Sequence, residues 1–296
     1  MSLHVVIGTA PCSWGVWWPD GTPSGTPWNV FLDQAAAAGY SALELGPVGY
    51  LPTDLEQLKD ELALRKLSIC GGTACFEFLK ADSFQDVHAQ VDDICKRVVA
   101  LGAKQLMTMD ACPMDRAKKA QLGDAYEKVY DIFGEMGKYC RDTYGVQVLM
   151  HPERCSLIET RQDLINLIDR GLDICFDNGH YAAANGSWEK NDQSSLNFYR
   201  EFHEKIPYLH FKNVSSDIRH KEMTGEIPQG DARLDDDLMC LLEDGIINYE
   251  QFRDLLDQYN FDGVGIIEQD CPHADTDTAF AMAKTNLQYL QKIHMI

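Results

Sequence analysis

Short apolar segments alternate along the chain with longer amphipathic segments, and the alternation repeats eight times. The apolar segments lack a polar face, which is typical of strands that are buried on both sides. These predicted strands cover residues 4–10, 41–45, 67–73, 104–109, 146–151, 172–176, 208–212 and 263–268. An amphipathic segment with helical periodicity follows each of them. These predicted helices cover residues 29–38, 54–65, 85–101, 117–143, 161–169, 196–204, 249–259 and 277–293.

The eight β-then-α units predict an α/β protein with a (β/α)8 TIM barrel that covers residues 1–296 as a single domain. The alternative is a doubly wound open sheet, which normally carries a glycine-rich phosphate-binding turn after its first strand. The first turn here, TAPCSWGVWWPDGTP, is rich in Pro and Trp, which favours the barrel. Residues 11–28 and 213–235 are the longest irregular segments, and both would lie at the catalytic mouth. Residues 224–237, which overlap the end of the second segment, are expected to form a lid.

The composition limits the expected partners and compartment. A formal net charge of −20 repels nucleic-acid phosphates and anionic lipids, so neither nucleic acid nor a membrane is an expected partner. No apolar segment approaches the roughly 20 residues that a membrane helix needs, and the N-terminus lacks the pattern of a signal peptide. The ten cysteines include no CxxC pair, which favours free thiols in a reducing compartment. We therefore expect a soluble, cytoplasmic protein.

Acidic and imidazole side chains gather at or near the ends of the predicted strands. In a barrel the carboxyl ends of all strands meet at one face, so these side chains should converge there. Each alone has an ordinary explanation as a helix cap or a solvated loop residue, but together they favour a site. They are Glu44, Asp110, His151, Glu153, Asp177, His210 and Glu268. Such a mixed set of oxygen and nitrogen ligands suits Mn²⁺, Co²⁺, Mg²⁺, Fe²⁺ or Zn²⁺, so a divalent metal is the expected cofactor.

Two short motifs add candidate catalytic groups. The segment DNGH follows a predicted strand, so Asp177 is a candidate ligand, and His180 is a candidate ligand or substrate-orienting residue. His210 and Lys212 are two residues apart on a strand, which places both side chains on the same side. Lys212 is then a candidate for stabilising an oxyanion or moving a proton. The ordinary alternatives are the first turn of a helix for His180 and a surface position for Lys212.

The segment MHPERCSLIETR, at the end of the fifth predicted strand, leaves its ligand open. His151, Glu153 and Glu159 compete for one metal-ligand role, and Glu159 alternatively fits the N-terminus of the next helix. Glu268, by contrast, closes the last predicted strand and is a strong ligand candidate.

Aromatic residues cluster after the first predicted strand. Trp14, Trp17 and Trp18 fit the apolar face of a sugar or cyclitol ring, although packing under a long loop is the alternative. Glu44 in the segment LELG is placed to hydrogen-bond a substrate hydroxyl. The expected partner is therefore a small-molecule sugar or cyclitol, with Trp14, Trp17 and Glu44 as candidate substrate-binding residues. A homodimer or homotetramer stays open.

At these residues the chain resembles the xylose isomerase-like TIM-barrel superfamily, which contains sugar isomerases, ketose 3-epimerases, inosose dehydratases and, more distantly, endonuclease IV. The resemblance runs from IGTAPCSWG through GYSALELG to HPERCSLIET, FDNGH, LHFKN and EQD. It implies a metal held by Asp177, His210, Glu268 and one carboxylate after the fifth strand. Glu159 occupies the place of the glutamate in the dehydratase-like pattern and so completes the implied ligand set.

The same resemblance gives His151 a different position. His151 stands where ketose epimerases have a ligand glutamate at the end of the strand, so the chain departs from the epimerase pattern there. We therefore group His151 with Glu153, His180 and Lys212 as candidate catalytic residues.

The chemistry that the resemblance implies is proton abstraction beside a carbonyl, with a metal that stabilises the enediolate. The leading hypothesis is a divalent-metal-dependent sugar isomerase or epimerase that acts on a ketose or a related polyol-derived ketone. The alternative is an inosose (2-keto-myo-inositol) dehydratase of inositol catabolism, which is a lyase. A second alternative is a catalytically inactive barrel that binds a polyol. The net charge of −20 argues against the DNA phosphodiesterase chemistry of endonuclease IV.

Overall fold

Eight parallel strands close into a barrel in the computed structural model, which describes residues 4–110, 116–228, 238–271 and 273–296. The ring runs β1, β10, β7, β6, β5, β4, β3, β2, and pairing of β1 with β10 closes it. The barrel strands are β1 (His4–Thr9), β2 (Ala42–Glu44), β3 (Ser68–Phe76), β4 (Gln105–Asp110), β5 (Gln147–Met150), β6 (Asp173–Asp177), β7 (Tyr208–Phe211) and β10 (Asp262–Ile267). The predicted α/β fold with a (β/α)8 TIM barrel is confirmed.

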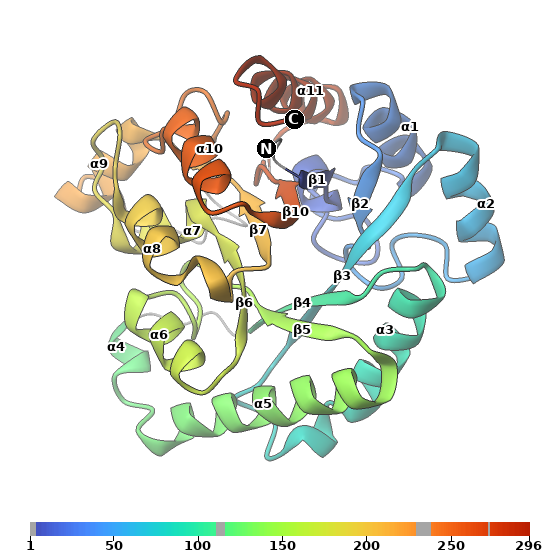
Figure 1. Ribbon diagram of the computed structural model, residues 1–296, viewed down its shortest axis with the longest axis horizontal. Helices are drawn as coiled ribbons and strands as arrows, with labels where there is room; N and C mark the ends of the chain where they lie inside the picture. Colours follow the sequence, from blue (N-terminus) through green and yellow to red (C-terminus); the bar gives the residue numbers. More distant parts are fainter. Residues whose placement is uncertain (1–3, 111–115, 229–237, 272) are drawn as a thin grey trace.

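The helices surround the barrel, and both chain ends lie near α11 and β1 (Figure 1). The helices are α1 (Trp28–Ala38), α2 (Leu55–Arg65), α3 (His88–Ala100), α4 (Arg116–Lys119), α5 (Asp124–Tyr144), α6 (Arg161–Asp169), α7 (Asn178–Asn185), α8 (Ser194–Phe202), α9 (Ser216–Thr224), α10 (Tyr249–Gln258) and α11 (Thr276–Lys292). A short antiparallel pair, β8 (Asn213–Val214) and β9 (Met239–Cys240), lies outside the barrel.

The helix boundaries follow local signals in the sequence. The side chain of Asp54 accepts a hydrogen bond from the Gln57 backbone N–H at 2.8 Å, which caps α2 as the sequence predicts. Gly39 ends α1 with a φ of 107°, a conformation that glycine adopts without a steric penalty. The predicted helix over residues 117–143 is divided into α4 and α5.

Two helices at the mouth of the barrel were not predicted. The first, α7, begins directly after β6 and carries the DNGH motif into its first turn. The second, α9, lies in the segment predicted to be irregular, where its sequence SDIRHKEMT has little apolar periodicity. The predicted lid covers residues 224–237, of which residues 229–237 lie outside the described residues.

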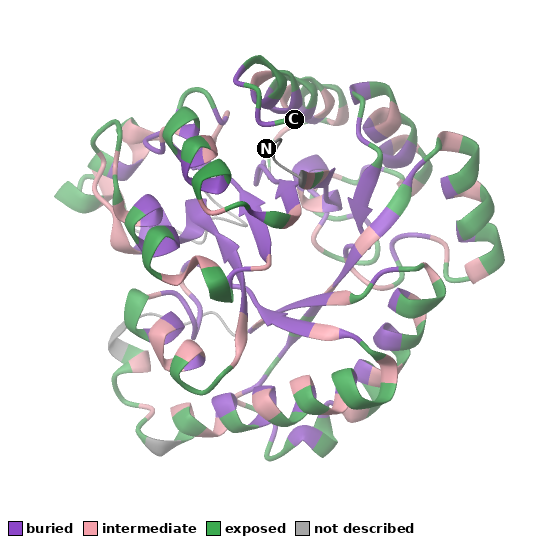
Figure 2. Ribbon diagram, viewed as in Figure 1, coloured by how far each residue is buried: buried purple, intermediate pink, exposed green. Residues whose placement is uncertain are grey.

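The barrel has an interior core and an outer core. Strand residues that point inward form the interior core, whose buried members are Ala10, Met107, Leu149, Cys175, Tyr208 and Ile266. The outer core lies between the strands and the helices, and Figure 2 shows buried strands enclosed by helices with exposed outer faces. Within the described ranges, no helix combines the length and apolar character needed to cross a membrane.

The loop between β5 and α6 is anchored by Asp163. Its Oδ2 accepts hydrogen bonds from the backbone N–H groups of Glu159 at 3.0 Å and Thr160 at 2.7 Å. The same carboxylate pairs with the ammonium of Lys119 and accepts a hydrogen bond from the Tyr126 hydroxyl. Burial raises the pKa of Asp163, but the attraction of Lys119 and the hydrogen bonds outweigh burial, so the net pKa is lowered.

Replacing this anchor should destabilise the protein in a pH-dependent way. We expect Asp163→Ala to lower the free energy of unfolding by about 3 kcal/mol at pH 7, because Lys119 loses its partner in a mostly buried pair. Asp169→Ala, on the exposed face of the same helix, should change it by less than about 0.5 kcal/mol. Urea unfolding measures both differences.

The sign of the pH dependence follows from the lowered pKa. A carboxyl group with a depressed folded-state pKa stabilises the protein above its unfolded pKa of about 3.9 and loses that contribution as the pH falls through the folded value. The difference in the free energy of unfolding between the native protein and Asp163→Ala should therefore become smaller below about pH 4. A difference in the free energy of unfolding that stays constant over this pH range would contradict the role of the Asp163 carboxylate as an anchor of the loop.

Candidate metal centre

Four buried side chains converge at the mouth of the barrel from four neighbouring strands. His151 follows β5, Asp177 ends β6, His210 lies in β7, and Glu268 follows β10. Each offers one ligand atom, and these atoms all lie within 4.8 Å of one another. All four residues are buried. The fold therefore gathers two imidazoles and two carboxylates at the face where the sequence predicts a site.

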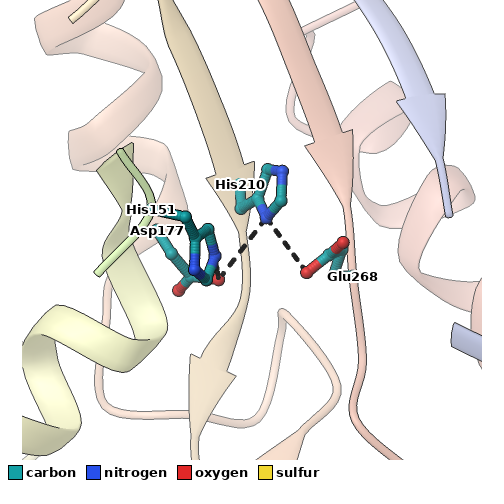
Figure 3. A group of neighbouring side chains, drawn as sticks. All are labelled: His151, Asp177, His210 and Glu268. Atoms are coloured by element: carbon teal, nitrogen blue, oxygen red, sulfur yellow. Dashed lines mark hydrogen bonds and ion pairs between the residues drawn. The ribbon is translucent and has the colours of Figure 1, made fainter. Parts of the chain in front are cut away.

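His210 lies between the two carboxylates, as Figure 3 shows. Its Nδ1 is 3.0 Å from Oε2 of Glu268 and 3.8 Å from Oδ2 of Asp177. The Nε2 of His151 lies 3.4 Å from the same Oδ2 of Asp177. The strand register produces this grouping, because Asp177 and His210 are directly paired across β6 and β7.

The donor atoms of this group fit a cation. Nε2 of His210 is 2.9 Å from Oε1 of Glu44, and a carboxylate can only accept, so the proton of a neutral ring lies on Nε2. The Nδ1 lone pair then faces the oxygens of Asp177 and Glu268, and Nδ1 is buried without a hydrogen-bond partner among the described residues. A divalent cation would relieve this electrostatic repulsion. A set of two imidazoles and two carboxylates suits Zn²⁺, Mn²⁺, Fe²⁺ or Co²⁺ better than an all-oxygen set does.

The electrostatics favour the ligand forms of His151, Asp177 and Glu268, but not that of His210. Burial lowers the pKa of His210, but Cys175, Glu268 and Glu44 outweigh burial and raise the pKa well above its ordinary value, so a cation would have to displace the proton on Nδ1. Burial lowers the pKa of His151, and the nearby His210 lowers it further. Together they outweigh the hydrogen bond to Asp177, which raises it, so the ring stays neutral. Burial alone would raise the pKa of Asp177, but Lys212 and His180 hold it well below the usual range. The pKa of Glu268 is likewise lowered, because His210 and Lys212 outweigh the effect of burial.

A second polar cluster adjoins the first and consists of Glu153, His180, Lys212 and Asp270. The Lys212 ammonium lies 2.9 Å from Oδ2 of Asp270 and 3.0 Å from Nε2 of His180. The same His180 nitrogen is 3.3 Å from Oε1 of Glu153 and 3.4 Å from Oδ2 of Asp270. Lys212 also reaches the candidate ligands, at 3.3 Å from Asp177 and 3.1 Å from Glu268.

The two cationic groups of this cluster are stabilised by carboxylates. Burial lowers the pKa of Lys212, but Asp177, Asp270 and Glu268 outweigh it, and the pKa is raised well above its ordinary value. A charged Lys212 can donate hydrogen bonds but cannot accept a proton. Burial also opposes protonation of His180, yet Glu153 above all raises its pKa on balance.

His151 and Glu268 of the first cluster and Glu153, Lys212 and Asp270 of the second line a cavity of about 470 Å³. The rest of its wall is largely apolar and includes Pro11, Trp17, Trp18, Val48, Ile94 and Met109. The Cys12 thiol also lines the cavity, and burial beside Glu268 and Asp270 raises its pKa well above the ordinary value. A cavity lined by both apolar and charged side chains suits a small ring that has carbon on one face and hydroxyl groups on its edge.

The structure separates the residues that the sequence proposed for substrate binding. Trp17 lines the cavity, whereas Trp14 is fully buried, packs edge-on against Phe31 with ring centroids 5.0 Å apart, and donates a 2.7 Å hydrogen bond to Gln34. Glu44 lines the cavity, but both of its carboxylate oxygens already accept hydrogen bonds from the protein.

Two further candidates from the sequence lie apart from the four-residue group. Glu159 is buried, and its Oε2 accepts a 3.0 Å hydrogen bond from the Cys155 backbone N–H. Asp110, at the end of β4, accepts a 3.3 Å hydrogen bond from the Phe78 backbone N–H. Of the three residues that compete for the ligand role after the fifth strand, His151 is the one that lies in the four-residue group.

Sequence reasoning missed Asp270 as a member of the site. The signal was present, because Asp270 follows Glu268 by two residues in the segment EQD, but β10 ends at Ile267. Beyond the end of the strand, side chains no longer alternate between two faces, so the sequence does not predict where Asp270 points. Its contacts with Lys212 and His180 show that it points into the site.

A closed (β/α)8 barrel whose mouth gathers imidazoles and carboxylates defines a class of barrel enzymes with a candidate metal centre. Residues 32–293 match the family described as xylose isomerase-like TIM barrel. The chain therefore belongs to this family, as its resemblance in sequence predicts.

Similar proteins fall into more than one reaction class. The inosose dehydratase of Histophilus somni is 22% identical over 312 residues, which cover 98% of this chain and 98% of that protein. A solved structure of the IolI protein with a bound zinc atom has a TM-score of 0.73 at 13% identity and covers 98% of both chains. D-psicose 3-epimerase with D-tagatose, from Clostridium cellulolyticum, has a TM-score of 0.67 at 14% identity and covers 98% of this chain and 99% of that one. At these identities, the solved structures show the shared fold alone.

The candidate metal centre predicts a change in bound metal without loss of the fold. Wild-type protein incubated with Mn²⁺ or Zn²⁺ and then dialysed should retain the metal, whereas His210→Ala and Glu268→Gln should retain much less because each removes a donor atom. His220→Ala, which alters an exposed histidine on α9, is the matched control. Elemental analysis measures the metal, and circular dichroism checks the fold. Wild-type metal content in both site variants would refute the assignment.

Proposed function

We propose that this chain is a metal-dependent dehydratase that removes water from a small polyol-derived ketone. The observation that carries the proposal is the second cluster, in which Lys212 and His180 lie 3.0 Å apart beside the candidate metal centre. Isomerisation and epimerisation require a proton to be removed and returned, whereas dehydration also requires a donor for the departing hydroxyl. Lys212 and His180 supply such donors. The inosose dehydratase relatives, which align with nearly the whole chain, support the same reaction class.

His151, Asp177, His210 and Glu268 would hold the metal, and this geometry supports His151 rather than Glu159 as the fourth ligand. When bound, the metal would supply a Lewis acid that polarises the substrate carbonyl. The carbonyl end of the substrate would therefore face this group, and the leaving hydroxyl would face the second cluster.

Glu153 is the proposed base. Its Oε1 is buried and has no hydrogen-bond partner among the described residues, although Nε2 of His180 lies 3.3 Å away. Glu153 removes the proton from the carbon next to the carbonyl, and the electron pair of that C–H bond forms the new C=C bond. Asp270 acts as a positioning residue, because it holds both Lys212 and His180.

Lys212 and His180 complete the elimination. The bond between the β-carbon and its hydroxyl oxygen breaks, and its electron pair leaves with the oxygen. Lys212 stabilises the developing negative charge on that oxygen, and the protonated ring of His180 gives its Nε2 proton to it and becomes neutral, so that water departs. The apolar wall that includes Trp17 and Trp18 would pack against the ring carbons of the substrate.

Proton NMR in deuterium oxide tests the reaction class. Metal-loaded protein with 2-keto-myo-inositol should give the unsaturated ketone and release water. A panel of ketoses is the comparison. Deuterium incorporation into a ketose, with a new ketose or aldose and no loss of water, would instead establish the isomerase or epimerase predicted first from the sequence.

Two variants should separate proton removal from loss of the hydroxyl group. Glu153→Gln should abolish both deuterium exchange at the α-carbon and water loss, because the base is gone. Lys212→Met should keep the exchange but slow water loss by about 100-fold or more, because the leaving oxygen loses a donor. Lys59→Met, at an exposed lysine on α2, should behave as wild type. Metal content is measured alongside, and equal loss of exchange and elimination in Lys212→Met at full metal content would contradict this division of roles.

A further inference from the structure

Glu44, at the end of β2, is held by three hydrogen-bond donors from two other strands. Its Oε1 accepts hydrogen bonds from the Tyr208 hydroxyl at 2.8 Å and from Nε2 of His210 at 2.9 Å. Its Oε2 accepts a 2.9 Å hydrogen bond from the Thr73 hydroxyl. The residue is almost completely buried. Both oxygens are therefore fixed in direction by the protein itself.

The contact with Glu44 determines how His210 presents its ring. In the neutral ring that binds a metal, the carboxylate accepts from Nε2, so the other ring nitrogen, Nδ1, carries the lone pair and faces Glu268 and Asp177. A carboxylate behind a ligand histidine fixes both the tautomer and the ring orientation, and it raises the basicity of the ligand atom.

Tyr208 and Gly71 extend this arrangement into the barrel interior. Tyr208 lies two residues before His210 on β7, so both side chains point inward, and its hydroxyl reaches Glu44. A bulge between Leu43 and Glu44 pairs Glu44 with Gly71 on β3. A Cβ at Gly71 would lie 2.6 Å from the Tyr208 hydroxyl oxygen, but 3.3 Å from the nearest ring carbon. The absence of a side chain at Gly71 is what leaves room for this hydroxyl.

We infer that Glu44, Tyr208 and Gly71 form a positioning unit that presents Nδ1 of His210 to a divalent metal. In this role Glu44 acts through His210 and does not bind substrate, although it lines the cavity. The inference rests on the proposed metal-dependent function and adds residues that act behind the ligands.

Metal affinity is the first test, measured for Zn²⁺ by competition with a chromophoric chelator. Glu44→Gln should weaken binding about 10- to 100-fold, because the tautomer of His210 is no longer fixed. Tyr208→Phe keeps the ring volume and should weaken binding several-fold. Tyr40→Phe is the matched control, because Tyr40 is also buried and its hydroxyl donates a 2.8 Å hydrogen bond to the Ala283 carbonyl, outside the site. It should leave the affinity unchanged.

A double-mutant cycle tests the contact with Gly71. Gly71→Ala should weaken Zn²⁺ binding in the native background, because the new methyl group displaces the Tyr208 hydroxyl. In the Tyr208→Phe background the same substitution should have little further effect, because the crowded oxygen is absent. Additive losses would show that the two positions act independently and would refute the unit.

Two more readouts separate positioning from substrate binding. In the Co²⁺-loaded protein, Glu44→Gln should shift the visible absorption bands, since the ligand field at the metal changes when His210 moves. At saturating metal, kcat should fall while KM stays nearly constant. A raised KM with unchanged Zn²⁺ affinity and an unchanged Co²⁺ spectrum would instead establish Glu44 as a substrate-binding residue.

His210→Ala distinguishes failure of this inference from failure of the proposed function. Loss of Zn²⁺ binding in His210→Ala, with wild-type affinity in Glu44→Gln and Tyr208→Phe, would overturn the positioning unit alone. Wild-type Zn²⁺ affinity in His210→Ala would overturn the metal centre on which the inference rests.

Discussion

Buried negative charge at the mouth of the barrel is the constraint on which the rest of the structure depends. Several carboxylates lie there in the protein interior around the ammonium of Lys212: Glu44, Glu153, Asp177, Glu268 and Asp270. Charged groups removed from water are costly unless they are paired and hydrogen-bonded. Lys212 pairs with three of these carboxylates, and Glu44 is satisfied by hydroxyl and imidazole donors. The remaining excess of negative charge is what makes the site suitable for a cation.

The charged side chains are brought together by the register of the parallel strands rather than by any one loop. Asp177 and His210 are paired across β6 and β7, and Glu268 follows the residue of β10 that pairs with Phe211. Inward-pointing positions two residues apart then place Tyr208, His210 and Lys212 in successive layers from the interior to the mouth. A shift of one residue in any of these strands would turn its functional side chain away from the site.

Side chains on or directly after the strands could be predicted from the sequence, whereas the positions of side chains further from the strands could not. The eight strands were predicted to within a few residues, and the strand ends led to His151, Asp177, His210 and Glu268, because buried strands have a strong apolar signal. The sequence did not predict that Trp14 lies in the core while Trp17 lines the cavity, since the contact of Trp14 with Phe31 on α1 determines this difference. Asp270 was missed for the same reason, because its direction depends on contacts made after β10 has ended.

Asp177 is the residue in which fold and site cannot be separated. Its Oδ1 accepts a 2.7 Å hydrogen bond from the His180 backbone N–H and so caps α7, while its Oδ2 faces His151, His210 and Lys212. One carboxylate thus serves both a helix end and the charged centre, and the free energies of the two are thermodynamically linked. A cation that binds more tightly when Asp177 caps α7 stabilises the first turn of that helix, and a disturbance of the turn weakens cation binding by the same factor.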